Sequence, residues 1–256
     1  MITGTIVFFY SFGDTQMKSV TMKKKHLLGV VLALLFFAAC KKDNLIIEPP
    51  VVIEKEDPLE YAHDSISYSI DGITYKLSEF SSFYGASNHQ PYSKVDSIVR
   101  NGYYISGIKD SVLYSRNYGI YTDGKKVDVM FIKTYNKASM LQSLILRPKD
   151  IMDLFTVGTR NYALDYGRDN IQNGVAISLS DGFKTYGSDN FRTPPQLSAD
   201  AQKNSKFEIT SLKKLNSGTY ILEAKFNATV YNEKNMSKKL ENGYLRLVMS
   251  KYDSIL

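Results

Sequence analysis

Cys40 carries the clearest chemistry in the sequence, because it is the only cysteine among 256 residues. A thiolate is a strong nucleophile, so a lone cysteine is a candidate for covalent modification. It follows three lysines at 23–25, an apolar run from Leu27 to Phe37, and two alanines. A positive segment, an apolar segment and small residues at a cleavage point form the anatomy of a secretory signal. The pattern therefore predicts a signal peptide over residues 22–39.

A cysteine directly after the small pair resembles the signal of a bacterial lipoprotein, which is cleaved before the cysteine and acylated on it. The resemblance implies lipidation of Cys40, with fatty acyl chains such as palmitate. A membrane-spanning helix is the weaker alternative, because it needs roughly 20 apolar residues and Lys41 ends this run too early. A buried helix would rarely begin with three lysines. Residues 1–21 fit no part of a signal, so we interpret them as a non-native N-terminal extension.

Catalytic and metal-binding patterns are sparse after the signal. The two histidines, His63 and His89, belong to no zinc-ligand spacing, and no Gly-x-Ser-x-Gly elbow occurs. Oxygen ligands cluster over residues 165–173, but their spacing differs from a calcium loop and favours a polar turn. We expect no cofactor, no metal and no catalytic residue. A hydrolase with paired carboxylates stays an alternative, because such pairs leave no local motif.

Tyrosine is abundant, with 19 copies against no tryptophan. Aromatic rings on loops can stack against sugars, although tyrosine also suits half-buried strand faces. The candidate ligand-binding tyrosines are Tyr84, Tyr92, Tyr103, Tyr104 and Tyr186.

Four short segments share the pattern Asp-Ser-aliphatic. One interpretation is a side-chain turn ahead of an apolar strand residue. The pattern also resembles the O-glycosylation sequon of exported Bacteroidota proteins, which implies modification of the central serine. The candidate positions are Ser65, Ser97, Ser111 and Ser254.

Charge argues against nucleic-acid binding. Removal of residues 1–39 takes away four of the 32 basic and one of the 26 acidic residues, leaving a net charge of about +3. The remaining basic residues are scattered among acids, whereas a nucleic-acid protein concentrates them on one face. We expect no nucleic-acid partner.

The elements that position these residues are strands. Residues 40–64 mix prolines and charges without a period, which predicts an extended tether. From Ser65 apolar and polar residues alternate, and six Asp-Gly or Asn-Gly pairs punctuate the chain, as in antiparallel hairpins. The longest alternation spans residues 219–231, and only one short helix, near 148–158, is expected. We therefore predict an all-β domain over 65–256, an antiparallel β-sandwich of jelly-roll or Ig-like type.

Three features resemble small uncharacterised lipoproteins of Bacteroidota with a C-terminal β-sandwich domain. They are the end of the signal in Ala38-Ala39-Cys40-Lys41-Lys42-Asp43, the tether, and the block from Lys206 to Tyr244. The resemblance implies only a fold and a cellular location. We expect an outer-membrane lipoprotein on the periplasmic or cell-surface face, acting as a non-catalytic binding or interaction module. Its partners would be the membrane, through Cys40, and a glycan or an envelope protein. A glycan-binding accessory lipoprotein is the nearest alternative.

Overall fold

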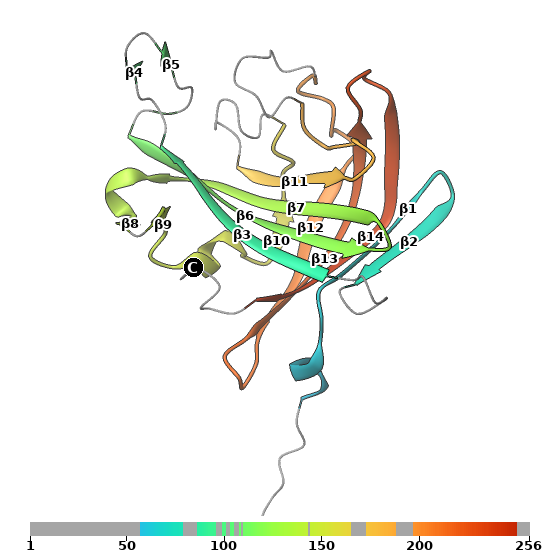
Figure 1. Cartoon of the computed structure of the whole chain (residues 1–256), viewed down its shortest axis with the longest axis horizontal. Coiled ribbons are helices and arrows are strands. Elements are labelled where there is room, and N and C mark those ends of the chain that lie inside the picture. Colours follow the sequence, from blue (N-terminus) through green and yellow to red (C-terminus); the bar gives the residue numbers. More distant parts are fainter. Residues whose placement is uncertain are drawn as a thin grey trace, which may run out of the picture. The chain divides into compact units, whose positions relative to one another are not determined.

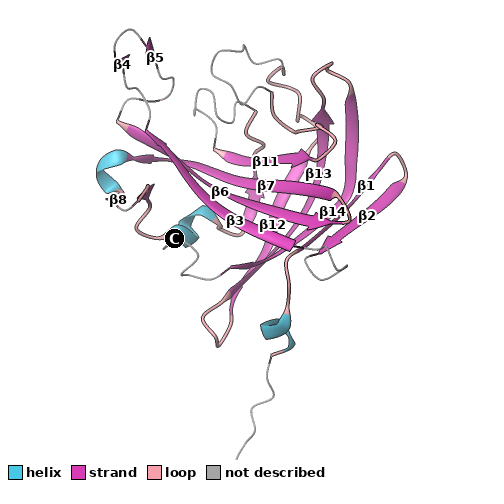
Figure 2. Ribbon diagram, viewed as in Figure 1, coloured by secondary structure: helices cyan, strands magenta, loops and turns pink. Residues whose placement is uncertain are grey.

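The computed structural model describes residues 57–78, 86–95, 99–100, 103–104, 108, 110–142, 144–164, 173–187 and 197–249. The chain divides into two units, residues 1–54 and 55–256, and every described residue belongs to the second unit. This part of the chain is all-β with antiparallel sheets packed together as in a β-sandwich, which confirms the predicted fold class (Figure 2). None of its helices is long and apolar enough to cross a membrane.

Seventeen elements make up the described chain. The strands are β1 (Ser65–Ile70), β2 (Ile73–Ser78), β3 (Ala86–Val95), β4 (Val99–Arg100), β5 (Tyr103–Tyr104), β6 (Ser111–Thr122), β7 (Lys125–Asn136), β8 (Leu141–Gln142), β9 (Leu146–Arg147), β10 (Gly158–Arg160), β11 (Gly174–Leu179), β12 (Lys206–Lys214), β13 (Tyr220–Tyr231) and β14 (Ser237–Met249). The short 3₁₀ helices are η1 (Pro58–Tyr61), η2 (Lys137–Ser139) and η3 (Ile151–Leu154).

Two main sheets form the sandwich (Figure 1). The larger has the strand order β10-β12-β13-β14-β1-β2, and the smaller has the order β11-β7-β6-β3. Hairpins join β1 to β2, β6 to β7, β12 to β13, and β13 to β14. In addition, β1 pairs with β14, so the first and last described strands of the domain lie side by side. Two-residue ladders, β4–β5 and β8–β9, and three isolated bridges among the described residues add to this pairing.

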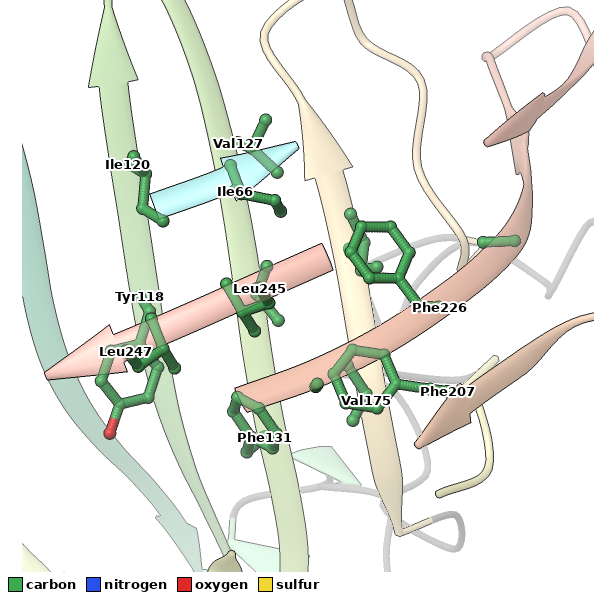
Figure 3. Packing of buried hydrophobic residues seen from close by; sticks show 14 of the residues in the cluster. Ile66, Tyr118, Ile120, Val127, Phe131, Val175, Phe207, Phe226, Leu245 and Leu247 are labelled. Atoms are coloured by element: carbon green, nitrogen blue, oxygen red, sulfur yellow. The ribbon is translucent and has the colours of Figure 1, made fainter. Parts of the chain in front are cut away.

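The core lies between the two sheets (Figure 3). In β1, buried residues alternate with half-buried ones, as the sequence pattern predicted. In β13, Leu222, Ala224, Phe226 and the following even-numbered residues are buried, so the predicted core face is confirmed. Aromatic rings link the sheets. The ring centroids of Phe131 of β7 and Phe207 of β12 lie 5.8 Å apart, in an edge-to-face arrangement.

The Asp-Gly and Asn-Gly pairs have different structural roles. Asp71-Gly72 and Asp123-Gly124 have positive φ at both residues and close the β1–β2 and β6–β7 hairpins, as predicted. The pair at 181–182 turns the chain after β11 through Gly182, with φ 85°. The pair at 173–174 instead begins β11, and the pair at 101–102 lies outside the described residues.

Asn242-Gly243 was expected to be a turn, but it forms a bulge within β14. Three residues of β14 span the same distance as two residues of β13, and the same shift occurs against β1. Asn242 has φ 52°, which allows the extra residue to leave the ladder. The Asn-Gly signature marks positive φ, and here a bulge uses it rather than a hairpin.

The sequence pattern does not reveal several local features of the fold. His89 belongs to β3, where it is paired with Tyr118 of β6. The β6 strand runs from Ser111 to Thr122, and its polar residues interrupt the alternation of apolar and polar positions. The predicted helix is the single turn η3, capped by Asp150, whose Oδ1 accepts from Met152 N at 2.9 Å.

The predicted tether, which was expected to reach Asp64, ends earlier. Asp57 Oδ2 accepts from Lys213 Nζ at 2.5 Å, and Glu60 Oε1 accepts from Ser217 N at 3.1 Å. Asp64 is 1 % exposed. Residues 57–64 therefore belong to the folded domain.

Candidate functional site

The candidate tyrosines have different environments. Tyr92 of β3 is 51 % exposed, whereas Tyr186 is buried and packs with Leu113, Met130 and Ile132. A buried ring has no free face for a sugar, so Tyr186 serves as core. Tyr103 and Tyr104 form β5, but their side chains and the whole of Tyr84 lie outside the described residues. Of this set, Tyr92 is the described side chain that faces solvent.

Tyr92 borders a shallow hollow of about 390 Å³ on the outer face of the smaller sheet. Strand pairing places Tyr92 opposite Ser115 and Gln90 opposite Asn117, so these four side chains share one face. The remaining lining residues are apolar: Pro91, Met130, Leu144 and Ile145. The hollow thus combines an exposed ring with amide and hydroxyl groups.

Asn117, which lines this hollow, has an unused hydrogen-bond acceptor. Its Nδ2 donates to Asp128 Oδ1 at 3.0 Å, and because a carboxylate can only accept, this contact fixes the orientation of the amide. Asn117 Oδ1 is then left buried and without a hydrogen-bond partner among the described residues. A buried acceptor of this kind favours a ligand that brings a donor.

Asp128 is itself held in place. Lys126 Nζ lies 2.8 Å from Asp128 Oδ2, and a Cβ added at Gly119 would meet Asp128 Oδ1 at 2.9 Å. Gly119 therefore gives the carboxylate the room to reach Asn117. The floor of the hollow is preorganised by this pair of contacts.

No protein-family model matches the chain, and no curated protein or solved structure is significantly similar to it. Any functional conclusion therefore depends on the chain's own residues.

A second hollow, of about 280 Å³, lies beside η3 and β10. Lys133 Nζ pairs with Asp153 Oδ2 at 2.6 Å, and Arg160 donates to Thr156 O at 2.6 Å. Burial lowers the pKa of Arg160, against the attraction of Asp153. Lys133 and Asp153 pair with each other, whereas Arg160 Nε is buried without a hydrogen-bond partner among the described residues. The aromatic residue that lines this hollow, Phe131, is buried, so the hollow lacks the exposed ring of the first.

The most buried ionisable pair, Asp64 and His89, was not predicted. Asp64 Oδ2 lies 2.5 Å from His89 Nε2, and Asp64 Oδ1 accepts from Val248 N at 2.7 Å. The His89 ring also packs edge-on against Tyr118, with centroids 4.7 Å apart. Both carboxylate oxygens are thus used to join β1, β3 and β14. We interpret the pair as structural rather than catalytic.

The candidate modification sites differ in exposure. Ser65 is half-buried in β1, and Ser111 is 5 % exposed with its Oγ donating to Ile108 O at 2.6 Å. A sugar on Ser111 would require this hydroxyl to leave its hydrogen bond. Cys40, Ser97 and Ser254 lie outside the described residues, so lipidation and glycosylation there stay predictions.

The calcium-like cluster also lies mostly outside the described residues. Its last member, Asn173, is described, and its Oδ1 accepts from Thr134 N at 2.7 Å. Over the part of the chain that the structure describes, no three His, Cys, Asp or Glu side chains gather as a metal site would require.

Proposed function

We propose that the chain is a lipid-anchored binding module of the cell envelope, and that it binds a carbohydrate in the hollow beside Tyr92. The predicted signal over residues 22–39 and Cys40 support the location in the cell envelope. The observation that carries the binding role is the combination of an exposed tyrosine ring with an unpartnered buried amide oxygen, on Asn117.

A sugar ring matches this chemistry. One face of a pyranose carries C–H groups that pack on an aromatic ring, and its edge carries hydroxyls. With the ring of Tyr92 under that face, a hydroxyl would donate to Asn117 Oδ1. Gln90 is exposed at the same rim and would supply further hydrogen bonds. The shallow shape suits the edge of an extended glycan rather than an enclosed small molecule.

The test is a glycan-array screen of the full-length protein in detergent. We expect binding to a subset of glycans, and a loss of roughly tenfold in affinity on Tyr92→Ala, the scale of one well-placed aromatic contact. Asn117→Asp should also weaken binding, because it changes the hydrogen bond to Asp128.

Tyr61→Ala is the matched control. Tyr61 is 66 % exposed, but it belongs to η1 and does not line the hollow. Its replacement should leave glycan binding unchanged. A uniformly silent array would overturn the carbohydrate assignment, and cross-linking of an envelope protein at Leu144 would then favour a protein partner.

A further inference from the structure

Arg116 is the largest fully buried side chain in the described part of the chain, with 2 % exposure. Its Nε and Nη2 atoms have no hydrogen-bond partner among the described residues, although both lie out of reach of solvent. Guanidinium stays protonated at all ordinary pH values, so these atoms are charged donors. Leaving such donors unpaired inside a protein is costly, which indicates that a partner belongs there.

Strand alternation places Arg116 inside the sandwich, on the side of the sheet opposite the Tyr92 hollow. Along β6, Tyr114 and Tyr118 share its face, and both are core residues. Across the sheet, Arg116 is opposite Phe131 on β7. Its guanidinium carbon lies 5.7 Å from the centre of the Tyr118 ring, a cation–π contact that leaves the N–H groups free to donate.

The two unpartnered nitrogens define the shape of the missing partner. Nε and one terminal nitrogen form one edge of a guanidinium, and their parallel N–H bonds match the two oxygens of a carboxylate. Arg246 shows this edge in use in the same protein, because its Nε and Nη2 donate to Glu223 Oε1 at 3.1 and 2.8 Å. The corresponding edge of Arg116 has no hydrogen-bond acceptor among the described residues.

A third donor lies on the same face. The Tyr114 hydroxyl is also buried without a hydrogen-bond partner in the described chain. Burial raises the pKa of Tyr114, against the positive charges of Arg116 and Arg147, so the hydroxyl keeps its proton at neutral pH. Tyr114 and Arg116 together present donors and positive charge, and what is lacking is an anionic acceptor.

We propose that Arg116 and Tyr114 form an internal binding site for the carboxylate of a small organic acid. The acid's apolar part would lie among the aromatic and aliphatic side chains of the core, and its carboxylate would accept from the Nε–Nη2 edge and from the Tyr114 hydroxyl. This site is separate from the proposed carbohydrate hollow, and neither depends on the other.

The experiment measures the thermal unfolding midpoint of the full-length protein against sodium propionate at constant ionic strength. Three matched additives serve as references: propionamide, which has the same shape without charge, sodium chloride and sodium phosphate. We expect a saturable rise in the midpoint with propionate and none with propionamide or chloride. A rise of equal size with chloride or phosphate would show an adventitious anion effect and overturn the carboxylate assignment.

Variants locate the effect. Arg116→Met should abolish the response, whereas Arg246→Met should keep it, because the Arg246 edge is already used by Glu223. Should Arg116→Met fail to fold, Tyr114→Phe removes a single hydroxyl and should lower propionate affinity roughly tenfold, the scale of one hydrogen bond to a charged group. An undiminished response in Tyr114→Phe and Arg116→Met, or no response in the wild type, would refute the site.

Discussion

At the scale of single residues, Gly243 illustrates how tightly the β14 bulge packs. A Cβ at this position would meet Phe226 O at 2.5 Å and two carbons of the Phe226 ring at 2.5 and 2.6 Å. The Phe226 carbonyl oxygen belongs to the backbone, which cannot move aside as a flexible side chain can. Gly243→Ala should therefore destabilise the domain by about 1–3 kcal/mol in urea unfolding. Glu241→Ala, at an exposed neighbouring position, should change stability by less than about 0.5 kcal/mol.

Glu223 gives a residue-scale prediction for pH. Hydrogen bonds from Tyr244 and Arg246 hold the pKa of Glu223 below its ordinary value. A carboxyl whose pKa is lower in the folded state stabilises the fold above its unfolded pKa of about 4.3, and this contribution is lost as the pH falls through the folded pKa. Thermal unfolding between pH 7 and pH 3 should show a smaller acid-induced loss of stability for Glu223→Gln than for the wild type. Parallel curves would contradict the role of this group.

At the scale of elements, Thr122 connects the end of β6 to the end of β2. Its Oγ1 accepts from Ser78 N at 3.1 Å and lies 2.9 Å from Ser78 O, so a side chain takes the place of a strand ladder where the two sheets meet. Thr122→Val keeps the shape and removes these bonds. We expect a loss of about 1–2 kcal/mol by chemical denaturation, with Thr122→Ser close to wild type. Equal losses in the two variants would point to packing instead.

The elements also show how far sequence patterns reach. Period-two alternation predicted β1 and β13 because one face of each is core and the other is polar. It also predicted β2, although Leu77 is buried there and Ile73 is exposed. The same rule does not reveal β6, because this strand is buried on both faces and contains Arg116 and Asn117. Alternation reports the contrast between two faces, so a strand covered on both sides gives no such signal.

Site residues were harder to predict than strands. Tyr92 was named from its type, but its neighbours Ser115, Asn117 and Gln90 come together only through the β3–β6 register. The Asp64–His89 pair was missed for the same reason, since its two members are distant in sequence. The burial of Arg116 was missed because it depends on the pairing of β6 with β3 and β7.

At the scale of the whole molecule, the prediction concerns the anchor. Cys40→Ser should move the protein from the membrane pellet to the soluble fraction and abolish incorporation of labelled palmitate, because the chain has no other thiol. Thermal unfolding of the domain should be unchanged, since Cys40 precedes the unit that begins at Lys55. Retention of label in the variant would place the modification elsewhere.

The pairing of β1 with β14 has a mechanical consequence. The chain enters the domain through contacts of Asp57, Glu60 and Asp64, and then passes into β1, which is hydrogen-bonded to a neighbour on each side. A pull on the preceding segment would load these polar contacts first and then act along β1, so two ladders would have to shear together. Such a geometry resists force better than a strand peeled from a sheet edge. If the domain is held through residue 40 as proposed, drag on it would therefore be borne by β1 and its two neighbours, which belong to the sheet that does not carry Tyr92.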